Sequence, residues 1–269
     1  MATLGEQGAW RLIAFFSILI TLLILETLMP QRKTARNSKE RLLTNGLLTI
    51  FNSFVMGLAA RAVVPIAAVA AAVYVDSKGW GLFNLLELAP TIELIASLVL
   101  LDLAIYGQHV AAHYVPMLWQ FHKVHHSDIE FDVTTALRFH PIEIFISMLW
   151  KIVLVFLLGP SVAAVTLFEI ILNGCAMFNH ANIKWPFWVD RVIRWFIATP
   201  DMHRIHHSII PRELNSNYGF SISLWDRLFG TYRWQPEKGH TEMKIGLENH
   251  QDSAPTKFLW SLKYPFTKG

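Results

Sequence analysis

The segment from Gln108 to Asp128 reads QHVAAHYVPMLWQFHKVHHSD, and a shorter segment from Asp201 to Ser208, DMHRIHHS, repeats its H-x-x-H-H spacing. Together they contain eight histidines, which are His109, His113, His122, His125, His126, His203, His206 and His207. Residues three or four positions apart lie on one face of an α-helix, so each group would present its imidazoles in one direction. One metal ion rarely takes more than about six ligands. Eight imidazoles therefore predict two metal ions with coordination positions left for oxygen or water.

The distribution of histidines separates this interpretation from the ordinary one, in which an isolated histidine on an apolar helix is a structural residue. Of the 12 histidines in the chain, all but His240 and His250 fall between His109 and His207. A single H-x-x-x-H match would be weak support, but the H-x-x-H-H pattern occurs twice. The pattern therefore favours a metal site.

Further segments surround these histidines. They are LDLAIYGQH from Leu101, VHHSD from Val124, TTALRFHP from Thr134, TPDMHRIHHS from Thr199, SNYGF from Ser216 and SLWDRLFGTY from Ser223. In this order, and among apolar segments, they resemble the fatty acid hydroxylase/sterol desaturase superfamily over roughly residues 40 to 234. The resemblance implies a non-haem centre of two iron ions. It also implies the use of dioxygen to hydroxylate or desaturate an aliphatic chain of a lipid.

The composition is that of a membrane protein. Of the 269 residues, 53% are hydrophobic and 16% are charged, and the mean hydropathy is +0.37. The net charge of +3, without a basic stripe interleaved with aromatic residues, argues against nucleic-acid binding. The single cysteine, Cys175, excludes a disulfide or a cysteine-ligated cluster within one chain. We therefore expect an all-α, polytopic membrane helix bundle.

The first part of the chain sets the predicted orientation. The apolar segment 10–29 lacks a basic leader and a small-residue cleavage site, so we expect an uncleaved anchor. The following segment, QRKTARNSKER, is basic, which is typical of the cytoplasmic side of a membrane. Residues 42–75 form an apolar run interrupted by Arg61 and Pro65. We expect one kinked span there, although a re-entrant pair of segments is the alternative.

The remaining apolar segments bring the count to about four or five spans. Residues 88–106 would return to the cytoplasmic side, and 142–158 and 162–178 would form a hairpin turning at Gly159-Pro160. All three histidine groups then lie on the cytoplasmic side, in a helical cap that carries the dinuclear site. The expected organisation is an anchor and basic loop (1–41), a catalytic membrane domain (42–234) and a polar tail (235–269). We expect the tail to be solvated, with His240 and His250 exposed.

Other residues are candidates by their position near the histidine groups. Related enzymes use extra ligands from the region between the second and third groups, so the resemblance suggests His180 as a ninth ligand and His140 as a possible further one. Asp102 lies seven residues before His109 on the same helical face, and Asp128 and Asp201 adjoin the other groups. Each carboxylate could accept a hydrogen bond from a ligand imidazole. Asp102 could equally form a salt bridge at the membrane boundary, and the other two could cap helices.

The chain must obtain electrons from another protein if this interpretation is right. It contains neither a G-x-G-x-x-G dinucleotide motif nor a cysteine cluster, and no fused haem domain. We therefore expect a separate electron-transfer partner of the ferredoxin or cytochrome b type. Basic residues near the clusters could bind that partner or, equally, anionic lipid. These residues are Lys123, Arg191, Arg194 and Arg204.

Three functional alternatives differ from a lipid hydroxylase. A lipid desaturase or a carotenoid hydroxylase would share the superfamily's motifs. A histidine-lined metal transporter should place its ligands near the bilayer midplane on discontinuous helices, whereas these histidines adjoin charged residues and prolines at the ends of spans. A catalytically inactive binding protein is disfavoured because none of the eight histidines is missing.

Overall fold

The computed structural model describes residues 4–33, 38–62 and 67–267, and this part of the chain is helical, with isolated β-bridges but no strand. The first eight helices run to the end of the last membrane hairpin. They are α1 (Leu4–Leu28), α2 (Ser38–Ala62), α3 (Ala68–Lys78), α4 (Leu82–Leu85), α5 (Pro90–Tyr114), α6 (Pro116–His126), α7 (Pro141–Leu158) and α8 (Val162–Asn179). Six short helices follow: α9 (Phe187–Ile193), α10 (Pro200–His206), α11 (Pro211–Leu214), α12 (Leu224–Leu228), α13 (Gly239–Glu242) and α14 (Phe258–Lys263).

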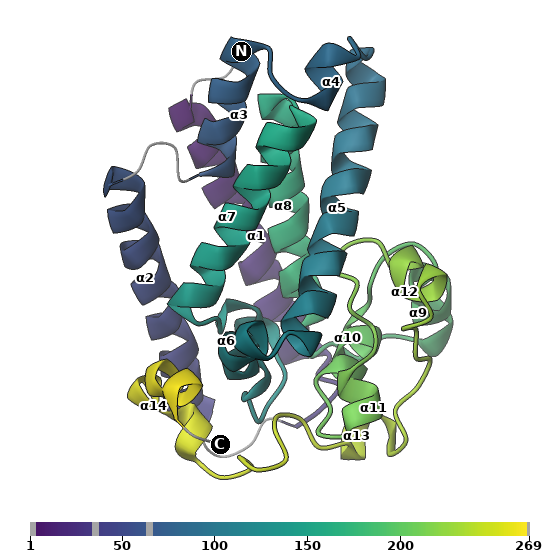
Figure 1. Cartoon of the computed structure of the whole chain (residues 1–269). Coiled ribbons are helices and arrows are strands. Elements are labelled where there is room, and N and C mark those ends of the chain that lie inside the picture. Colours follow the sequence, from purple (N-terminus) through teal and green to yellow (C-terminus); the bar gives the residue numbers. More distant parts are fainter. Residues whose placement is uncertain (1–3, 34–37, 63–66, 268–269) are drawn as a thin grey trace.

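Five of the described helices are long and apolar enough to cross a membrane, namely α1, α2, α5, α7 and α8. Large apolar side chains on their outer faces, such as Ile20, Ile50 and Ile95, are exposed, as expected for surfaces that contact lipid. Figure 1 shows these helices as a bundle, with α3 and α4 near one end and a cap formed by α6 and α9–α14 toward the other. The prediction of a polytopic helix bundle is confirmed.

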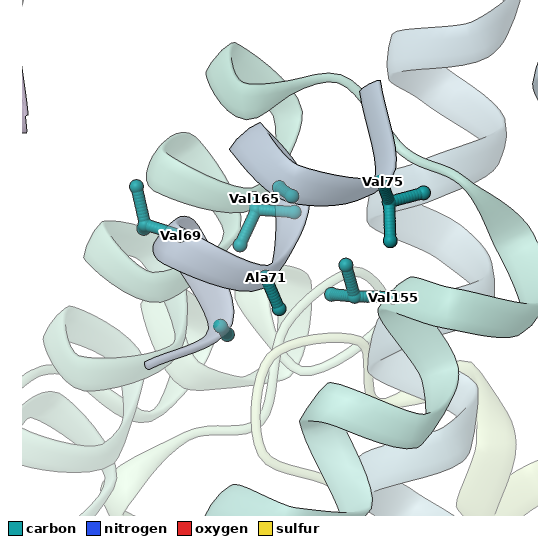
Figure 2. Close-up of a cluster of buried hydrophobic side chains, with 7 residues drawn as sticks. Val69, Ala71, Val75, Val155 and Val165 are labelled. Atoms are coloured by element: carbon teal, nitrogen blue, oxygen red, sulfur yellow. The ribbon is translucent and has the colours of Figure 1, made fainter. Parts of the chain in front are cut away.

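The apolar run 42–75 forms two helices rather than one continuous helix. The expected break at Pro65 and the side chain of Arg61 lie outside the described residues. α2 rises from the cap end of the bundle and α3 lies farther from the cap (Figure 1). α3 packs through Val69, Ala71 and Val75 against Val155 of α7 and Val165 of α8 (Figure 2). Its small side chains allow this short helix to lie close to the hairpin.

Local sequence signals fix the ends of the helices that carry histidines. Val115 ends α5, and Pro116 occupies the first turn of α6, where the missing N–H of proline costs nothing. Thr199 caps α10 by accepting a hydrogen bond from the Met202 N–H at 3.3 Å, and Pro200 opens that helix. Gly159 ends α7 in the left-handed conformation, at φ 66°. The turn at Gly159 was predicted from the sequence.

Glu93, to which the sequence assigned no role, joins α5 to the beginning of α8. Its Oε1 accepts hydrogen bonds from the Ser161 N–H at 2.9 Å and from the Ser97 hydroxyl at 2.7 Å. A carboxylate in a membrane span is costly unless its oxygens are satisfied. This acidic residue therefore fastens the turn between α7 and α8 to α5, at the end of the bundle far from the cap.

Residues 235–267 are a folded part of the cap, so the expectation of a solvated tail is wrong for the described part of 235–269. Met243 and Ile245 are buried together with Phe131. The guanidinium of Arg138 donates to the Pro255 carbonyl at 2.7 Å and to the Ser261 hydroxyl at 2.9 Å. A buried guanidinium requires such acceptors, and distant segments supply them. The local pattern of 235–269 contains no sign of that pairing.

Candidate metal centre

Nine imidazoles from four helices meet at the junction of the bundle and the cap. α5 contributes His109 and His113, α6 contributes His122, His125 and His126, and α10 with its C-cap contributes His203, His206 and His207. The ninth, His180, is the C-cap of α8. All are buried except His113, which is partly buried.

The nine imidazoles divide into two groups, within each of which one nitrogen per residue lies within 4.8 Å of the others. The group of five consists of His109, His113, His122, His126 and His206. The group of four consists of His125, His180, His203 and His207. The structure therefore brings together all eight clustered histidines and His180, in two sets of the size that a transition-metal ion binds.

Backbone carbonyls decide which nitrogen of several imidazoles carries the proton. Nδ1 of His109 lies 2.7 Å from the Tyr218 carbonyl oxygen, and Nδ1 of His206 lies 2.8 Å from that of Ser216. Nδ1 of His180 lies 2.7 Å from the Ala176 carbonyl oxygen. A carbonyl oxygen only accepts, so each Nδ1 must donate its proton. In the neutral ring, Nε2 then presents a lone pair to the interior of its group.

Several of these lone pairs have no proton donor. Nε2 of His109, His113 and His206 is buried without a hydrogen-bond partner among the described residues. Nε2 of His180 lies 3.1 Å from that of His125 and 3.1 Å from that of His203. Neutral imidazole acceptors facing one another in a buried site are costly unless a cation lies between them.

Burial also keeps the imidazoles in their neutral, metal-binding form. Burial lowers the pKa of His180 to about 4. Burial, reinforced by neighbouring imidazoles, lowers the pKa of His125, His203 and His207 well below the usual value. A deprotonated ring nitrogen is what a metal ligand requires. The donor set and its burial therefore fit two transition-metal ions.

A pair of loops in the cap holds the accepting carbonyls in place. Asp226 accepts hydrogen bonds from the Tyr218 N–H at 2.7 Å and the Gly219 N–H at 2.8 Å. A Cβ on Gly219 would lie 2.8 Å from an Asp226 oxygen, so only glycine allows this close approach. Asp102 accepts from the Trp225 Nε1–H at 2.8 Å and the Ile222 N–H at 3.1 Å. The SNYGF and SLWDRLFGTY segments thus orient His109 and His206 through the backbone.

The three aspartates expected to bind ligand imidazoles have other partners. Asp102 binds the cap loop, as described above. Asp128 forms an ion pair with Arg41 at 2.9 Å and accepts from the Thr135 hydroxyl at 2.9 Å. Asp201 forms an ion pair with Arg204. No hydrogen bond between any of them and a clustered imidazole occurs in the described part of the chain.

The carboxylate that does bind a clustered imidazole is Glu143, in the first turn of α7. Its Oε1 lies 2.5 Å from Nδ1 of His122. Hydrogen bonds of this kind fix the ring orientation of metal-binding histidines. Sequence reasoning missed Glu143, although it follows the RFHP segment by two residues and begins a helix that returns from the cap.

His140 lies outside both groups. Its Nδ1 accepts a hydrogen bond from the Ile142 N–H at 3.2 Å and so caps α7, while its Nε2 lies 3.3 Å from the Leu262 carbonyl oxygen.

The two histidines of the C-terminal segment have partners in the cap. The His240 carbonyl accepts a hydrogen bond from Arg32 at 2.8 Å, and burial lowers the pKa of the His240 imidazole to about 4, so His240 is more enclosed than predicted. His250 packs edge-on against Trp260 and Tyr264.

The basic residues suggested as a docking surface are mostly inaccessible. Lys123 is buried over the ring of Tyr264, 4.2 Å from its centroid. Arg194 and Arg204 are buried in ion pairs with Asp190 and Asp201. Of the four, Arg191 alone is exposed. These residues therefore do not form a joint surface for a partner or for lipid. The basic run 31–41 is likewise partly internal, since Arg41, at the beginning of α2, is buried against Asp128 and Asp132.

A cavity of about 170 Å³ leads from the group of five into the membrane bundle. His109 and His122 lie at one part of its wall, together with Glu143. Apolar residues of α5, α7 and α8 line much of it, and Phe220 of the cap also lines it. The polar residues Gln108, Ser147, Lys151 and Asn173 also contribute. An apolar cavity that reaches the imidazoles from the bundle suits an aliphatic ligand.

Helical spans and a cap with nine converging imidazoles define a class of membrane protein with a polyhistidine site. The family model for fatty acid hydroxylases matches residues 94–231, which contain all nine imidazoles and the residues that orient them. The chain belongs to the fatty acid hydroxylase family and is an integral membrane protein.

Relatives with assigned names agree with this family. The chain is 32% identical to alkylglycerol monooxygenase of Xenopus tropicalis over 51% of its length, and 30% identical to ornithine lipid hydroxylase of Rhizobium tropici over 65%. It is 24% identical to cholesterol 25-hydroxylase of Rattus norvegicus over 58%. The matches span 30%, 51% and 51% of these relatives, respectively. No solved structure matches the chain significantly.

Proposed function

We propose that the protein is a di-iron oxygenase that hydroxylates an aliphatic C–H bond of a membrane lipid. The observation that carries this proposal is the cavity that joins the lipid-embedded helices to His109 and His122 of the group of five. The names of the relatives support lipid hydroxylation as the reaction type. The protein would then be an oxidoreductase.

Each group of imidazoles would hold one iron ion, with the group of five nearer to the substrate cavity. Aliphatic C–H bonds resist acid, base and nucleophilic attack, so a redox metal with dioxygen is the chemistry that the two ions would supply. The chain itself brings one ring nitrogen of each of the nine imidazoles into these two groups. Glu143 and the carbonyls of Ser216 and Tyr218 hold rings in position.

The walls of the cavity would position the substrate. Ile105, Ala112 and Leu172 offer apolar contact to an alkyl chain, and Phe220 lies both in the cavity wall and 4.9 Å, between ring centroids, from His109. These contacts would exclude water and place a carbon near the imidazoles. Electrons would come from a separate partner of the ferredoxin or cytochrome b type. The basic run before α2 favours a cytoplasmic position for the cap.

The location of the imidazoles disfavours a metal transporter. His113 lies in the last turn of α5, and α6 and α10 belong to the cap (Figure 1). The groups are therefore at the end of the spans, and each histidine lies either within one of the four helices or at its C-cap. A transport site would be expected near the midplane, on interrupted helices.

Lipid analysis under labelled dioxygen tests the proposed reaction. Cells that express the chain should accumulate a lipid that has gained one oxygen atom, and this atom should carry the label when the cells grow under ¹⁸O₂. Cells that express His125→Ala, which lacks one ligand, provide the control. A lipid that has lost two hydrogen atoms instead would identify a desaturase. Lipid profiles that do not differ between the chain and His125→Ala would contradict the proposal.

A further inference from the structure

Three charged side chains form an ion network inside the membrane-spanning part of the bundle. Glu169 of α8 is buried, and its Oε1 lies 3.1 Å from the Lys151 Nζ of α7. Its Oε2 lies 2.7 Å from the Arg11 guanidinium of α1. Charged groups at such positions are expensive and commonly mark functional sites.

The network contains more positive than negative charge. Arg11 and Lys151 share the single carboxylate of Glu169, and Arg11 already pairs with one of its oxygens. Neutralising Glu169 therefore does not require Lys151. An ammonium group has three donors, of which the contact with Glu169 uses one. Lys151 thus retains charge and hydrogen-bonding capacity for a ligand.

Lys151 faces the cavity that reaches the imidazoles, whereas Arg11 is not among the residues that line it. Ser147 and Asn173 line the same cavity and add polar atoms one helical turn from Lys151 and Glu169, respectively. A plain alkyl chain would gain nothing from this polar end. An oxygen-bearing group of the substrate would gain hydrogen bonds and a charge partner there.

The position of Lys151 on α7 gives the distance of this polar end from the candidate metal centre. Glu143, which binds His122, lies eight residues earlier on the same helix. At a rise of 1.5 Å per residue, the two positions are about 12 Å apart along the helix. An extended lipid segment of that length would connect the polar end to the imidazoles.

We propose that Lys151, with Ser147 and Asn173, forms a subsite for an anionic oxygen group of the lipid substrate. Lys151 lies about 12 Å along α7 from Glu143, the residue that binds His122, so the anionic group and the oxidised carbon would lie at opposite ends of the cavity. The inference rests on the proposed function, because it assigns the other end of the cavity to the candidate metal centre. The substrate class is then an amphipathic lipid that carries a carboxylate or phosphate within the bundle, rather than a hydrocarbon tail without polar groups.

Equilibrium binding of two lipids tests the subsite without turnover. The probes are dodecanoate and dodecanol, which have chains of equal length, with the full chain in nanodiscs of zwitterionic lipid at neutral pH. We expect dodecanoate to bind at least about tenfold more tightly than dodecanol. Lys151→Met should abolish this difference, and Lys151→Arg should largely keep it.

Arg191→Gln is the control, because Arg191 is an exposed cation of the cap that does not line the cavity. It should keep the preference for dodecanoate, while thermal unfolding shows that both variants fold. Equal binding of the two probes by the unaltered chain would overturn the proposal, as would equal loss of the preference in Arg191→Gln and Lys151→Met. A Lys151-dependent preference in a protein that oxidises no lipid would support the subsite and contradict the proposed reaction.

Discussion

Nε2 of His125 and Nε2 of His180 lie 3.1 Å apart, although neither nitrogen has a proton to donate in the neutral tautomer. Nδ1 of His125 faces the Arg138 carbonyl oxygen at 3.2 Å, and Nδ1 of His180 faces that of Ala176 at 2.7 Å. The two rings come from α6 and α8, which are 55 residues apart at these positions. Two lone pairs held together in this way are what a bound cation would stabilise.

The pairing leads to a prediction about metal content. His180→Ala should lower bound iron from about two ions to about one per chain, because the group of four would retain three imidazoles. Activity in lipid oxidation should fall with it. His140→Asn is the control, since asparagine preserves a helix cap and His140 lies outside both groups. Elemental analysis of the two purified variants measures their bound iron. Two ions and full turnover in His180→Ala would contradict the ninth-ligand proposal.

Asp128 should be important for stability rather than for the metal. Burial raises the pKa of its carboxyl, but the charges of Arg41 and Arg138 outweigh that effect and hold the pKa below its usual value. Removing one partner of a buried ion pair lowers the free energy of unfolding by about 3–5 kcal/mol. The loss for Asp128→Asn should lie at the low end of this range, because Arg41 keeps its ion pair with Asp132.

Thermal unfolding in detergent measures this loss, with Glu248→Gln on the exposed surface as the control. Folded Asp128→Asn should retain its iron. An unchanged unfolding temperature combined with loss of iron would show instead that Asp128 acts on the metal site, as its position in the sequence first suggested.

The neutral histidines predict a dependence of stability on pH for protein stripped of metal. The pKa of His180 falls from 6.5 to about 4 on folding. Between these values the unfolded chain binds more protons than the folded chain, so the free energy of unfolding decreases as the pH falls. Above about 6.5 the full stability is present. Each pKa unit corresponds to about 1.4 kcal/mol for one group. Unfolding temperatures at about pH 7.5 and about pH 5 should differ clearly, and equal values would contradict the inferred burial of neutral rings.

The orientation in the membrane can be tested with single cysteines. In a Cys175→Ser background, Lys78→Cys marks the end of α3 far from the cap, and Glu248→Cys marks the cap (Figure 1). If the basic run before α2 is cytoplasmic, an impermeant maleimide should label position 78 in intact cells. It should label position 248 only after permeabilisation. The reverse pattern would place the candidate metal centre outside the cell.

Local patterns were sufficient where a feature depends on near neighbours in the chain. The helix starts at Pro116 and Pro200 and the end at Gly159 follow from the backbone chemistry of proline, threonine and glycine. The apolar runs gave the spans because lipid admits only helices of that length and composition. The place of the segment 235–267 depended instead on its packing against Phe131 and its hydrogen bonds with Arg138.

The sequence by itself determined that this chain is a helical membrane protein of the fatty acid hydroxylase family, because apolar length and histidine spacing are local properties. Only the tertiary structure decided how the imidazoles divide into groups of five and four, that Glu143 rather than an aspartate binds His122, and that Lys151 faces the cavity. The physical reason is that these relationships join different helices. Spacing along one helix fixes the face on which a side chain lies, but the packing of the bundle fixes what that face meets.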